Sequence, residues 1–379
     1  MKILLVLPAN APYRVLPGQS VPRRAMLRFS VLPLTTVAAL TPPQHQVELV
    51  DENVRPLDVE AQADLVALSF MTACAPRAYE IAAAFRKRGI PVVGGGYHPT
   101  FCTEEALGHL DAVVKGDAEE AWPRLLSDLE SGKLQRIYAH EAPPSLETTP
   151  APRRELLGAW GRYYATQHAV QTSRGCRHGC RFCSITAFHG ATLRHRPVDR
   201  VLREIGEAPK AFIFVDDNLV ADVPYARTLL EGLRPLRKRW ASQCTLRIAD
   251  DPNLLKLAKG AGCVGLFVGL ESLDPRNLEA VDKGVNVERD SLARIRKIRQ
   301  AGIAVQAAVI VGLDHDDPGV FRRTLTFLQN ARVDALQLSI LTPLPGTPLF
   351  ADFEAQGRLL DRNWNHYDFR HVVIQPALM

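Results

Sequence analysis

Three cysteines within one short run have the clearest chemical potential in this sequence. Cys176, Cys180 and Cys183 follow the spacing Cys-x3-Cys-x2-Cys. Thiolates are soft ligands that suit iron–sulfur clusters. A cubane cluster of four irons normally takes four thiolates, so three thiolates leave one iron open to a ligand that is not protein. The run therefore predicts a [4Fe-4S] cluster that binds and reduces a substrate instead of only carrying electrons.

Two other interpretations of this run stay open from its residues alone. A structural zinc ion also takes thiolate and imidazole ligands, and His178 or His189 would complete such a site. The other possibility is a disulfide between two of the three cysteines. The chain has 7 cysteines, an odd number, and the other four are scattered singly, which does not indicate a regular disulfide framework.

More candidate site residues follow the cysteines, at or near the ends of predicted strands, where a β/α barrel carries its functional groups. An inward arginine there would hold a carboxylate in bidentate fashion or pair with a nearby acidic residue. Aspartate and asparagine also favour any strand-to-helix turn, which is the structural alternative. The candidates are Asp216, Asp217, Asn218, Arg247, Glu271, Ser272 and Gly312.

The run Asp314-His315-Asp316-Asp317 invites a metal-site interpretation, which we reject. Asp317 precedes Pro318 and is typical of a helix cap, and the rest of the run is expected to be a solvated turn. Asp222, Asp251 and Asp274 likewise stand beside prolines and predict helix starts.

Two successive β/α alternations must position these residues. In the first, helical spacing separates short apolar strands, which predicts a doubly wound, Rossmann-like parallel sheet with its ligands at the carboxyl ends of the strands. Its strands are expected at 2–8, 47–51, 63–70, 91–96 and 112–116. The second alternation has six β/α units, too few for a closed eight-fold barrel. Its strands are expected at 169–173, 211–216, 241–248, 264–270, 305–311 and 335–340.

The domain boundaries follow from these alternations. Residues 1–135 form the first domain, and the proline-containing stretch 136–165 lacks periodicity and is expected to be a linker. Residues 166–379 form the second domain with a short C-terminal extension.

Together, the cysteine run and the strand-end motifs resemble the radical S-adenosylmethionine (radical SAM) family. The resemblance implies a partial (β/α)6 barrel and an open iron that chelates S-adenosylmethionine, whose reductive cleavage releases a 5′-deoxyadenosyl radical. Phe182 matches the aromatic residue that packs against the adenine. Val215-Asp216-Asp217-Asn218, Gly269-Leu270-Glu271-Ser272 and the segment around Gly312 match further cofactor-binding motifs. No family motif is matched at Arg247, whose side chain would meet the methionine carboxylate or pair with a nearby acidic residue.

The N-terminal domain resembles the cobalamin-binding domain that is fused to many radical SAM proteins. Glycines let backbone lie close to a flat, bulky macrocycle, although a Gly-rich turn occurs in any α/β domain. The residues expected to line the cobalamin site are Ser69, Gly94, Gly95, Gly96, Tyr97 and His98. The Asp-x-His-x-x-Gly motif of His-ligated cobalamin domains is absent, and His98 is expected to bond locally or to a corrin amide. The carboxyl ends of both sheets are expected to face one cavity.

The composition is that of an ordinary globular protein of 379 residues, with 46% hydrophobic and 23% charged residues. A net charge of +5 gives little support to nucleic-acid binding. No apolar run predicts a membrane span, and no export signal is recognised, so a reducing cytoplasm is expected. The resemblance implies an electron donor such as flavodoxin or ferredoxin, and a small molecule or biosynthetic intermediate as substrate.

Within this family, C-methylation of an unactivated carbon is the activity that we expect. One S-adenosylmethionine would supply the methyl group through cobalamin, and a second would supply the radical. A cyclisation, rearrangement or oxidation without methyl transfer is the alternative enzyme activity. A non-catalytic iron–sulfur or corrinoid-binding accessory protein is the third interpretation, supported by a C-terminal region shorter than that of family relatives.

Overall fold

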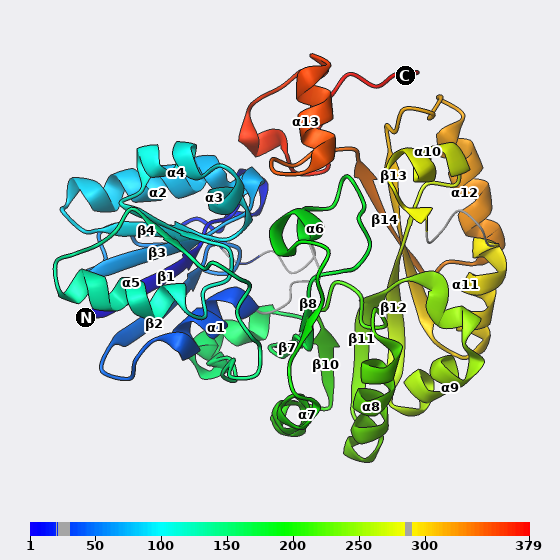
Figure 1. The fold of residues 1–379 in the computed structure, drawn as a ribbon, viewed down its shortest axis with the longest axis horizontal. Coiled ribbons are helices and arrows are strands. Elements are labelled where there is room, and N and C mark those ends of the chain that lie inside the picture. The colour runs from blue at the N-terminus through cyan, green and yellow to red at the C-terminus, as the bar shows by residue number, and fades with distance from the viewer. Residues whose placement is uncertain (20, 22–30, 285–289) are drawn as a thin grey trace. The chain divides into compact units, whose positions relative to one another are not determined.

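The computed structural model describes residues 1–19, 21, 31–284 and 290–379, and it divides into two compact units (Figure 1). Unit 1 comprises Met1–Ala169 and Asn363–Asp368, and unit 2 comprises Val170–Arg362 and Phe369–Met379. Each unit has its own parallel sheet and its own core. None of the helices in these residues is long and apolar enough to cross a membrane.

Unit 1 is built on a six-stranded sheet with the order β2-β1-β3-β4-β5-β6, in which every neighbouring pair is parallel. Its strands are β1 (Lys2–Leu7), β2 (Gln46–Asp51), β3 (Leu65–Ser69), β4 (Val92–Gly95), β5 (Ala112–Lys115) and β6 (Ile137–Ala139). Its helices are α1 (Leu32–Leu40), α2 (Ala75–Lys87), α3 (Tyr97–Phe101), α4 (Thr103–His109) and α5 (Ala121–Glu130).

Strand β1 shows why this sheet is covered on both faces. Ile3 and Leu5 belong to the core on the side of α1 and α5, whereas Leu4 and Val6 belong to the core on the side of α2 and α4. Successive side chains of a strand point to opposite faces, so a continuous apolar run predicts burial on both. The predicted doubly wound sheet is confirmed.

The stretch 136–165 differs from the expected linker. It contains β6, and a 3-10 helical segment, Arg154–Tyr163, places Leu157 in the core of unit 1 beside Tyr164. A strand of three residues is too short to show the alternation of apolar and polar side chains that marks a strand. The prolines around it therefore led to the prediction of a linker.

Unit 2 carries a second six-stranded sheet, with the order β14-β13-β12-β11-β10-β7, which is open because β14 and β7 are both edges. Its strands are β7 (Ala169–Val170), β10 (Ala211–Phe214), β11 (Arg239–Cys244), β12 (Cys263–Glu271), β13 (Ala304–Val311) and β14 (Ala335–Ile340). Two further strands, β8 (Ser173–Arg174) and β9 (Arg194–His195), form an antiparallel pair. The predicted partial barrel is confirmed.

The helices of unit 2 alternate with these strands. They are α6 (Ser184–His189), α7 (Val198–Glu207), α8 (Val223–Leu233), α9 (Pro252–Gly260), α10 (Pro275–Ala280), α11 (Ser291–Gln300), α12 (Val320–Ala331) and α13 (Pro348–Ala355). Asp222, Asp251 and Asp274 cap α8, α9 and α10 as predicted. Asp317 does not cap α12: that helix begins at Val320 with Gly319 at its N-cap, and the Asp317 carboxylate accepts the Gly319 N–H instead.

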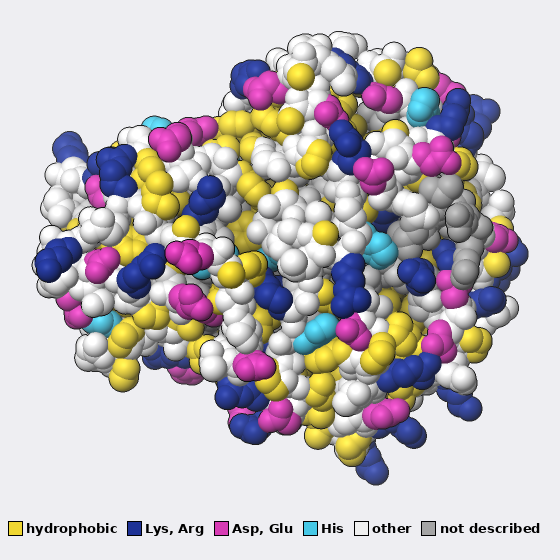
Figure 2. Space-filling model, in the orientation of Figure 1, with side chains coloured by type: hydrophobic (Ala, Val, Ile, Leu, Met, Phe, Trp, Pro, Cys, Tyr) yellow, Lys and Arg dark blue, Asp and Glu magenta, His cyan; other side chains and the backbone are white. Residues whose placement is uncertain are grey.

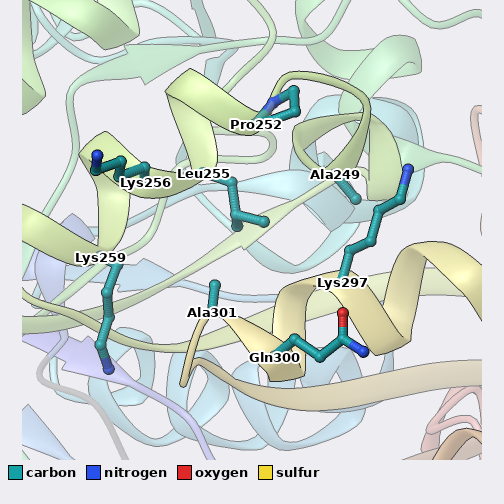
Figure 3. Close-up of a pocket in the computed structure, with 8 residues that line it drawn as sticks. All are labelled: Ala249, Pro252, Leu255, Lys256, Lys259, Lys297, Gln300 and Ala301. Carbon is teal, nitrogen blue, oxygen red and sulfur yellow. The ribbon is translucent and has the colours of Figure 1, made fainter.

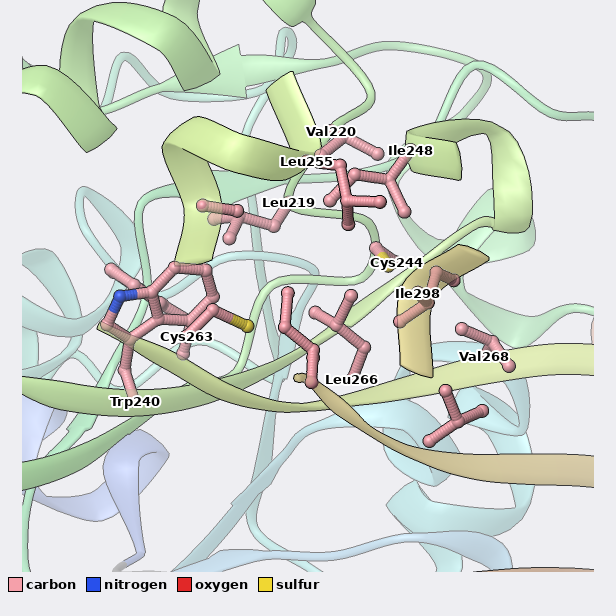
Figure 4. Packing of buried hydrophobic residues seen from close by; sticks show 14 of the residues in the cluster. Leu219, Val220, Trp240, Cys244, Ile248, Leu255, Cys263, Leu266, Val268 and Ile298 are labelled. Atoms are coloured by element: carbon pink, nitrogen blue, oxygen red, sulfur yellow. The ribbon is translucent and has the colours of Figure 1, made fainter. Parts of the chain in front are cut away.

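The core of unit 2 lies between the sheet and these helices (Figure 4). Trp240 is fully buried there, and its indole N–H donates to the Ala261 carbonyl at 2.9 Å. Cys244 and Cys263 pack in the same cluster, and burial raises the pKa of the Cys263 thiol to about 12. These two cysteines are apolar core residues, separate from the cysteine run.

Candidate functional site

The cysteine run forms the loop between β8 and α6. Cys180 is buried, whereas Cys176 and Cys183 are half-buried. The Cys183 N–H donates to the Cys180 carbonyl at 3.1 Å, and Cys183 is also the N-cap residue of α6, which begins at Ser184. The loop backbone is held from two sides, because the Arg181 N–H donates to Val281 and the Arg181 carbonyl accepts from Leu349, both at 3.1 Å.

Burial and neighbouring charges act together on the pKa values of the thiols in the cysteine run. Burial raises the pKa of Cys180 to about 11, and the positive charge of Lys283 opposes this rise. Burial also raises the pKa of Cys176, again against Lys283. The negative charges of Cys176 and Cys183 each raise the pKa of Cys180, so the three thiols interact electrostatically.

The donor set of the cysteine run is three thiols on one short loop. A separate group of three potential ligands within 4.8 Å of one another, His98, Cys102 and Glu105, lies in unit 1. Three thiolates on one loop are the donor set that an iron–sulfur cluster takes.

The two histidines of the zinc interpretation have other surroundings. Burial, together with the charges of Lys283 and Arg247, lowers the pKa of His178. The Nδ1 atom of His189 lies 3.1 Å from the Arg194 guanidinium, which donates to it. All seven cysteines are free thiols in the structure, so no disulfide competes for the run.

Asp216 joins the end of β10 to the start of the cysteine loop. Its carboxylate is fully buried and accepts from the backbone N–H groups and the hydroxyls of both Thr172 and Ser173, at 2.6–3.1 Å. Burial raises the pKa of Asp216, while these donors oppose the rise. The carboxylate therefore anchors the chain just before the cysteines, and its direct contact with S-adenosylmethionine stays a prediction.

The side chains of Asp217 and Asn218, which follow Asp216, accept hydrogen bonds from neighbouring loops. The Asp217 carboxylate accepts the Gly175 N–H at 3.2 Å, and burial raises the pKa of Asp217 to about 7. The side-chain oxygen of Asn218 accepts the Thr245 N–H at 3.2 Å. The structure thus brings the Asp216–Asn218 segment against both the cysteine loop and the end of β11.

Arg247 lies beyond the strand in which it was predicted. Strand β11 ends at Cys244, and Arg247 is an exposed residue of the 3-10 helix Leu246–Asp250. The chain turns there because the Ile248 N–H donates back to the Thr245 carbonyl. Its charge nevertheless acts on His178, which places it on the side of the cysteine loop.

Glu271 has a strained backbone at the end of β12, with a φ of 62°. The register of β12 against β13 shifts between Gly269 and Glu271, so the Glu271 side chain folds back over Gly269. A Cβ at position 269 would lie 2.2 Å from the Glu271 Oε1 atom, so glycine there lets the carboxylate take this position. Non-glycine residues with positive φ cluster at functional sites.

A buried polar network links the β12 and β13 loops. Asn277 donates to the Ser272 hydroxyl at 3.2 Å and to the Asp316 carboxylate at 2.8 Å. Asp316 in turn accepts the Gly312 N–H at 3.0 Å, and Gly312 has a φ of 97°. Asp316 is only 1% exposed, so the expectation of a solvated turn is wrong for this residue. The sequence analysis did not single out Asn277 and took Asp316 for part of a solvated turn, because no sequence pattern marks a contact between these two loops.

Lys283 is another residue that sequence reasoning missed. Its ammonium lies 3.0 Å from the Glu271 carboxylate and 5.8 Å from the centre of the Phe182 ring. Phe182 stands between the last two cysteines, so Lys283 joins the Glu271 loop to the cysteine loop. A lone lysine after α10 carries no signal in the sequence.

In unit 1, the predicted cobalamin residues gather at the carboxyl ends of β3 and β4. Ser69 is the register partner of Gly95, and the chain enters α3 at Tyr97. Gly96 has a φ of 95°, and a Cβ there would lie 3.1 Å from the Phe70 carbonyl oxygen. Strand order changes direction between β1 and β3, and sheets of this order bind ligands at that switch point.

His98 is fully buried, and its side chain bonds locally. Its Nε2 atom lies 3.1 Å from the Tyr79 hydroxyl and 3.5 Å from the Glu105 carboxylate, and its Nδ1 atom lies 3.4 Å from the Thr72 hydroxyl. Glu105 also accepts from the Trp364 indole at 2.9 Å. The His98 backbone is occupied as well, because its N–H donates to Phe70 and its carbonyl accepts from Cys102.

A surface groove of unit 2 lies apart from these motifs (Figure 3). Its floor is apolar and its sides carry lysines from α9 and α11. Its lining comprises Ala249, Pro252, Leu255, Lys256, Lys259, Lys297, Gln300 and Ala301. None of the strand-end motif residues lines it, so it is not the predicted site. On the face shown in Figure 2, basic and acidic side chains are interspersed.

Each unit of the chain matches the model of a known protein family. The radical SAM superfamily model matches residues 170–328, and the B12 binding domain model matches residues 27–126. These matches cover the strand-end motifs of unit 2 and the glycine run of unit 1.

Individual relatives match most of the chain. Bacteriochlorophyllide d C-12(1)-methyltransferase of Chlorobaculum tepidum is 31% identical over 91% of this chain and 78% of its own length. The C-8(2)-methyltransferase of the same organism is 30% identical over 90% of this chain and 80% of its own length. The solved structure of TsrM, a radical S-adenosylmethionine methyltransferase from Kitasatospora setae with cobalamin and a [4Fe-4S] cluster bound, shares the fold with a TM-score of 0.73. It is 19% identical and matches 94% of this chain and 78% of that one. The chain therefore belongs to the radical SAM enzymes that carry an N-terminal B12-binding domain.

Proposed function

We propose that this protein is a cobalamin-dependent radical SAM methyltransferase that methylates an unactivated carbon of a small-molecule substrate. The observation that carries the proposal is the convergence of three free thiols, Asp217 and the Glu271–Lys283 pair around one loop of unit 2. The bacteriochlorophyllide methyltransferases similar to this chain act on carbon, as their names state.

Cys176, Cys180 and Cys183 would hold a [4Fe-4S] cluster through three irons. When bound, the cluster supplies the electron that cleaves the sulfonium of S-adenosylmethionine. The protein's part is to hold the loop: Asp216 anchors its start through Thr172 and Ser173, and Val281 and Leu349 bond to Arg181 within it. Cys180 is buried and Cys176 and Cys183 are half-buried, which limits access of water to the site.

The S-adenosylmethionine site lies on the loops that follow the strands of unit 2. Phe182 would stack on the adenine, and Gly312 would let backbone approach it. Glu271 and Ser272 would bind the ribose and methionine, with Asp217 and Asn218 near the amino group. Asp216 would position these groups, and Arg247 would reach the methionine carboxylate.

Cobalamin would bind at the carboxyl edge of the sheet in unit 1. Its cobalt supplies a centre that accepts and donates the methyl group. Ser69, Gly94, Gly95, Gly96, Tyr97 and His98 would form the site, with His98 supporting it through its local hydrogen bonds. The small side chains of Ser69 and Gly95, adjacent in register, support a broad and flat contact.

A protein electron donor such as flavodoxin or ferredoxin would be needed for each cleavage, since the reaction consumes one electron. A reducing compartment, the cytoplasm, is proposed because all seven cysteines are free thiols.

The test is anaerobic reconstitution with iron, sulfide and hydroxocobalamin, followed by an assay for 5′-deoxyadenosine and S-adenosylhomocysteine. A chlorin tetrapyrrole would be the first substrate offered. Both products together support methylation. 5′-Deoxyadenosine alone indicates radical chemistry without methyl transfer, and neither product, with any substrate offered, indicates a binding role.

Two binding measurements accompany this assay. The triple variant Cys176→Ala, Cys180→Ala, Cys183→Ala is expected to lose the visible absorbance and the bound iron. Equilibrium dialysis with hydroxocobalamin is expected to give one corrinoid per chain. Full iron in the triple variant, or zinc in the native protein, would contradict the cluster.

A further inference from the structure

Lys283 carries a buried positive charge beside the cysteine loop. Its side chain is 13% exposed and that of its partner Glu271 is 10% exposed. The ammonium lies 3.0 Å from Glu271 and 5.8 Å from the centre of the Phe182 ring. At such a distance, the ring face attracts a cation.

The backbone holds this lysine in place. The Arg181 N–H of the cysteine loop donates to Val281, two residues before Lys283, and the Lys283 N–H donates to Leu278 at 2.8 Å. Asp282 between them has a φ of 54°, which turns the chain sharply. A Cβ at position 269 would lie 3.4 Å from the Lys283 ammonium, so Gly269 leaves room for both members of the pair.

Stability alone does not account for this pair. Burying two charges costs several kcal/mol per ion before their attraction is counted, and apolar replacements of such pairs are often neutral or stabilising. A buried ion pair in a strained turn, next to metal-binding thiols, indicates that its charge has a use at the site.

The two ends of the pair are placed differently with respect to the cysteine loop. The Lys283 ammonium lies over the ring of Phe182, which directly precedes Cys183, whereas Glu271 at the end of β12 holds that ammonium at 3.0 Å. The ammonium is therefore the end of the pair that contacts the cysteine loop.

We propose that Lys283 is a positioning residue that raises the reduction potential of the cluster by holding its ammonium beside the cysteine thiolates. The inference rests on the proposed cluster and adds a residue that sets its redox behaviour. Reduction adds one negative charge to the cluster, and a fixed positive charge nearby stabilises that added charge more strongly in a buried site than in water. The potential of an iron–sulfur cluster follows the net charge around it. Glu271 partly offsets the effect while it holds the lysine in place.

The test is the midpoint potential of the cluster, measured by an EPR-monitored redox titration of the reconstituted protein without substrate. Lys283→Met is expected to shift the potential to more negative values, and Lys283→Arg is expected to keep it close to wild type. Glu271→Gln removes the opposing charge and is expected to shift the potential to more positive values. Disturbed packing would move the Met and Gln variants in the same direction, whereas the charge effect predicts opposite directions.

Lys256→Met, at an exposed lysine of α9, removes the same charge outside the cysteine loop and is the matched control. Shifts in one common direction, or shifts no larger than that of the control, would overturn the proposal. If the Lys283→Met variant takes up no iron, the Glu271→Gln variant still tests the inference. An unchanged or more negative midpoint potential of the cluster in Glu271→Gln would contradict it. If the wild-type protein holds a cluster and cleaves S-adenosylmethionine but the variants lack the expected shifts, this inference fails and the proposed function stands. If the wild-type protein holds no cluster, both the inference and the proposed function fail.

Discussion

The carboxylate of Asp216 accepts both the backbone N–H and the hydroxyl of Thr172, at 3.1 and 2.6 Å. The two residues are 44 positions apart, and Thr172 stands four residues before the first cysteine of the run. The geometry of the cysteine loop is thus tied to the end of the neighbouring strand β10. The same carboxylate holds Ser173, so one buried charge orders the entry into the loop.

Asp216→Asn should weaken this anchor. The amide removes the charge and places a donor where N–H groups already point, so we expect the free energy of unfolding to fall by about 1–3 kcal/mol. Iron uptake on reconstitution should fall as well. Urea unfolding and iron analysis check both effects. Asp199→Asn, at an exposed position of α7, is the control and should change stability by less than about 0.5 kcal/mol. An Asp216 variant as stable as this control would contradict the anchor.

Asp217 should give the protein a characteristic dependence of stability on pH. Burial raises its pKa from 3.8 to about 7, so folding favours the neutral carboxyl. Its stabilising contribution is complete below a pH of about 4 and is lost as the pH rises through about 7. Asp217→Asn cannot ionise, so its stability relative to wild type should increase between about pH 4 and about pH 7 and stay level above that. Urea unfolding of the cluster-free proteins across this range measures the difference, and a flat difference would refute the prediction.

Gly269→Ala should weaken binding of S-adenosylmethionine and leave the cluster intact. The added methyl group would lie 2.2 Å from the Glu271 carboxylate, so that side chain must move. We expect the dissociation constant to rise about tenfold, which corresponds to about 1.4 kcal/mol, with unchanged iron content. Gly206→Ala in α7 is the control, because a Cβ there meets nothing within 4 Å. Equal affinities in the two variants would show that the space over Gly269 is not needed.

The Trp364–Glu105 contact should stabilise unit 1 measurably. The Trp364 indole donates to both Glu105 oxygens, at 2.9 and 3.1 Å, and it thereby holds the segment Asn363–Asp368. Trp364→Phe is expected to lower the free energy of unfolding by about 1–3 kcal/mol, because the acceptor is charged. A double-mutant cycle with Glu105→Gln, followed by thermal unfolding, should give a coupling energy of at least about 0.5 kcal/mol. Additive effects of the two substitutions would disprove the contact.

Features that are local in the chain could be predicted from the amino-acid sequence. Cysteine spacing, apolar strands and capping aspartates are short-range patterns, so the cysteine loop, both sheets and the starts of α8, α9 and α10 were predictable. β6 was missed because three residues are too few to carry a period. Arg247 was placed in a strand because nothing local marks the turn after Cys244.

The contacts between charged side chains could not be predicted in this way, because they depend on how distant segments pack. Glu271 and Lys283 are separated by α10, and Asp216 lies a full β/α unit after the hydroxyls that it binds. Such contacts depend on the register of parallel strands and on turns such as Asp282, which position side chains that share no sequence pattern. Burial determines how strongly such a contact holds. An exposed aspartate after a strand is an ordinary turn residue, because water competes for its hydrogen bonds. The buried Asp216 carboxylate anchors a loop, because no water competes there.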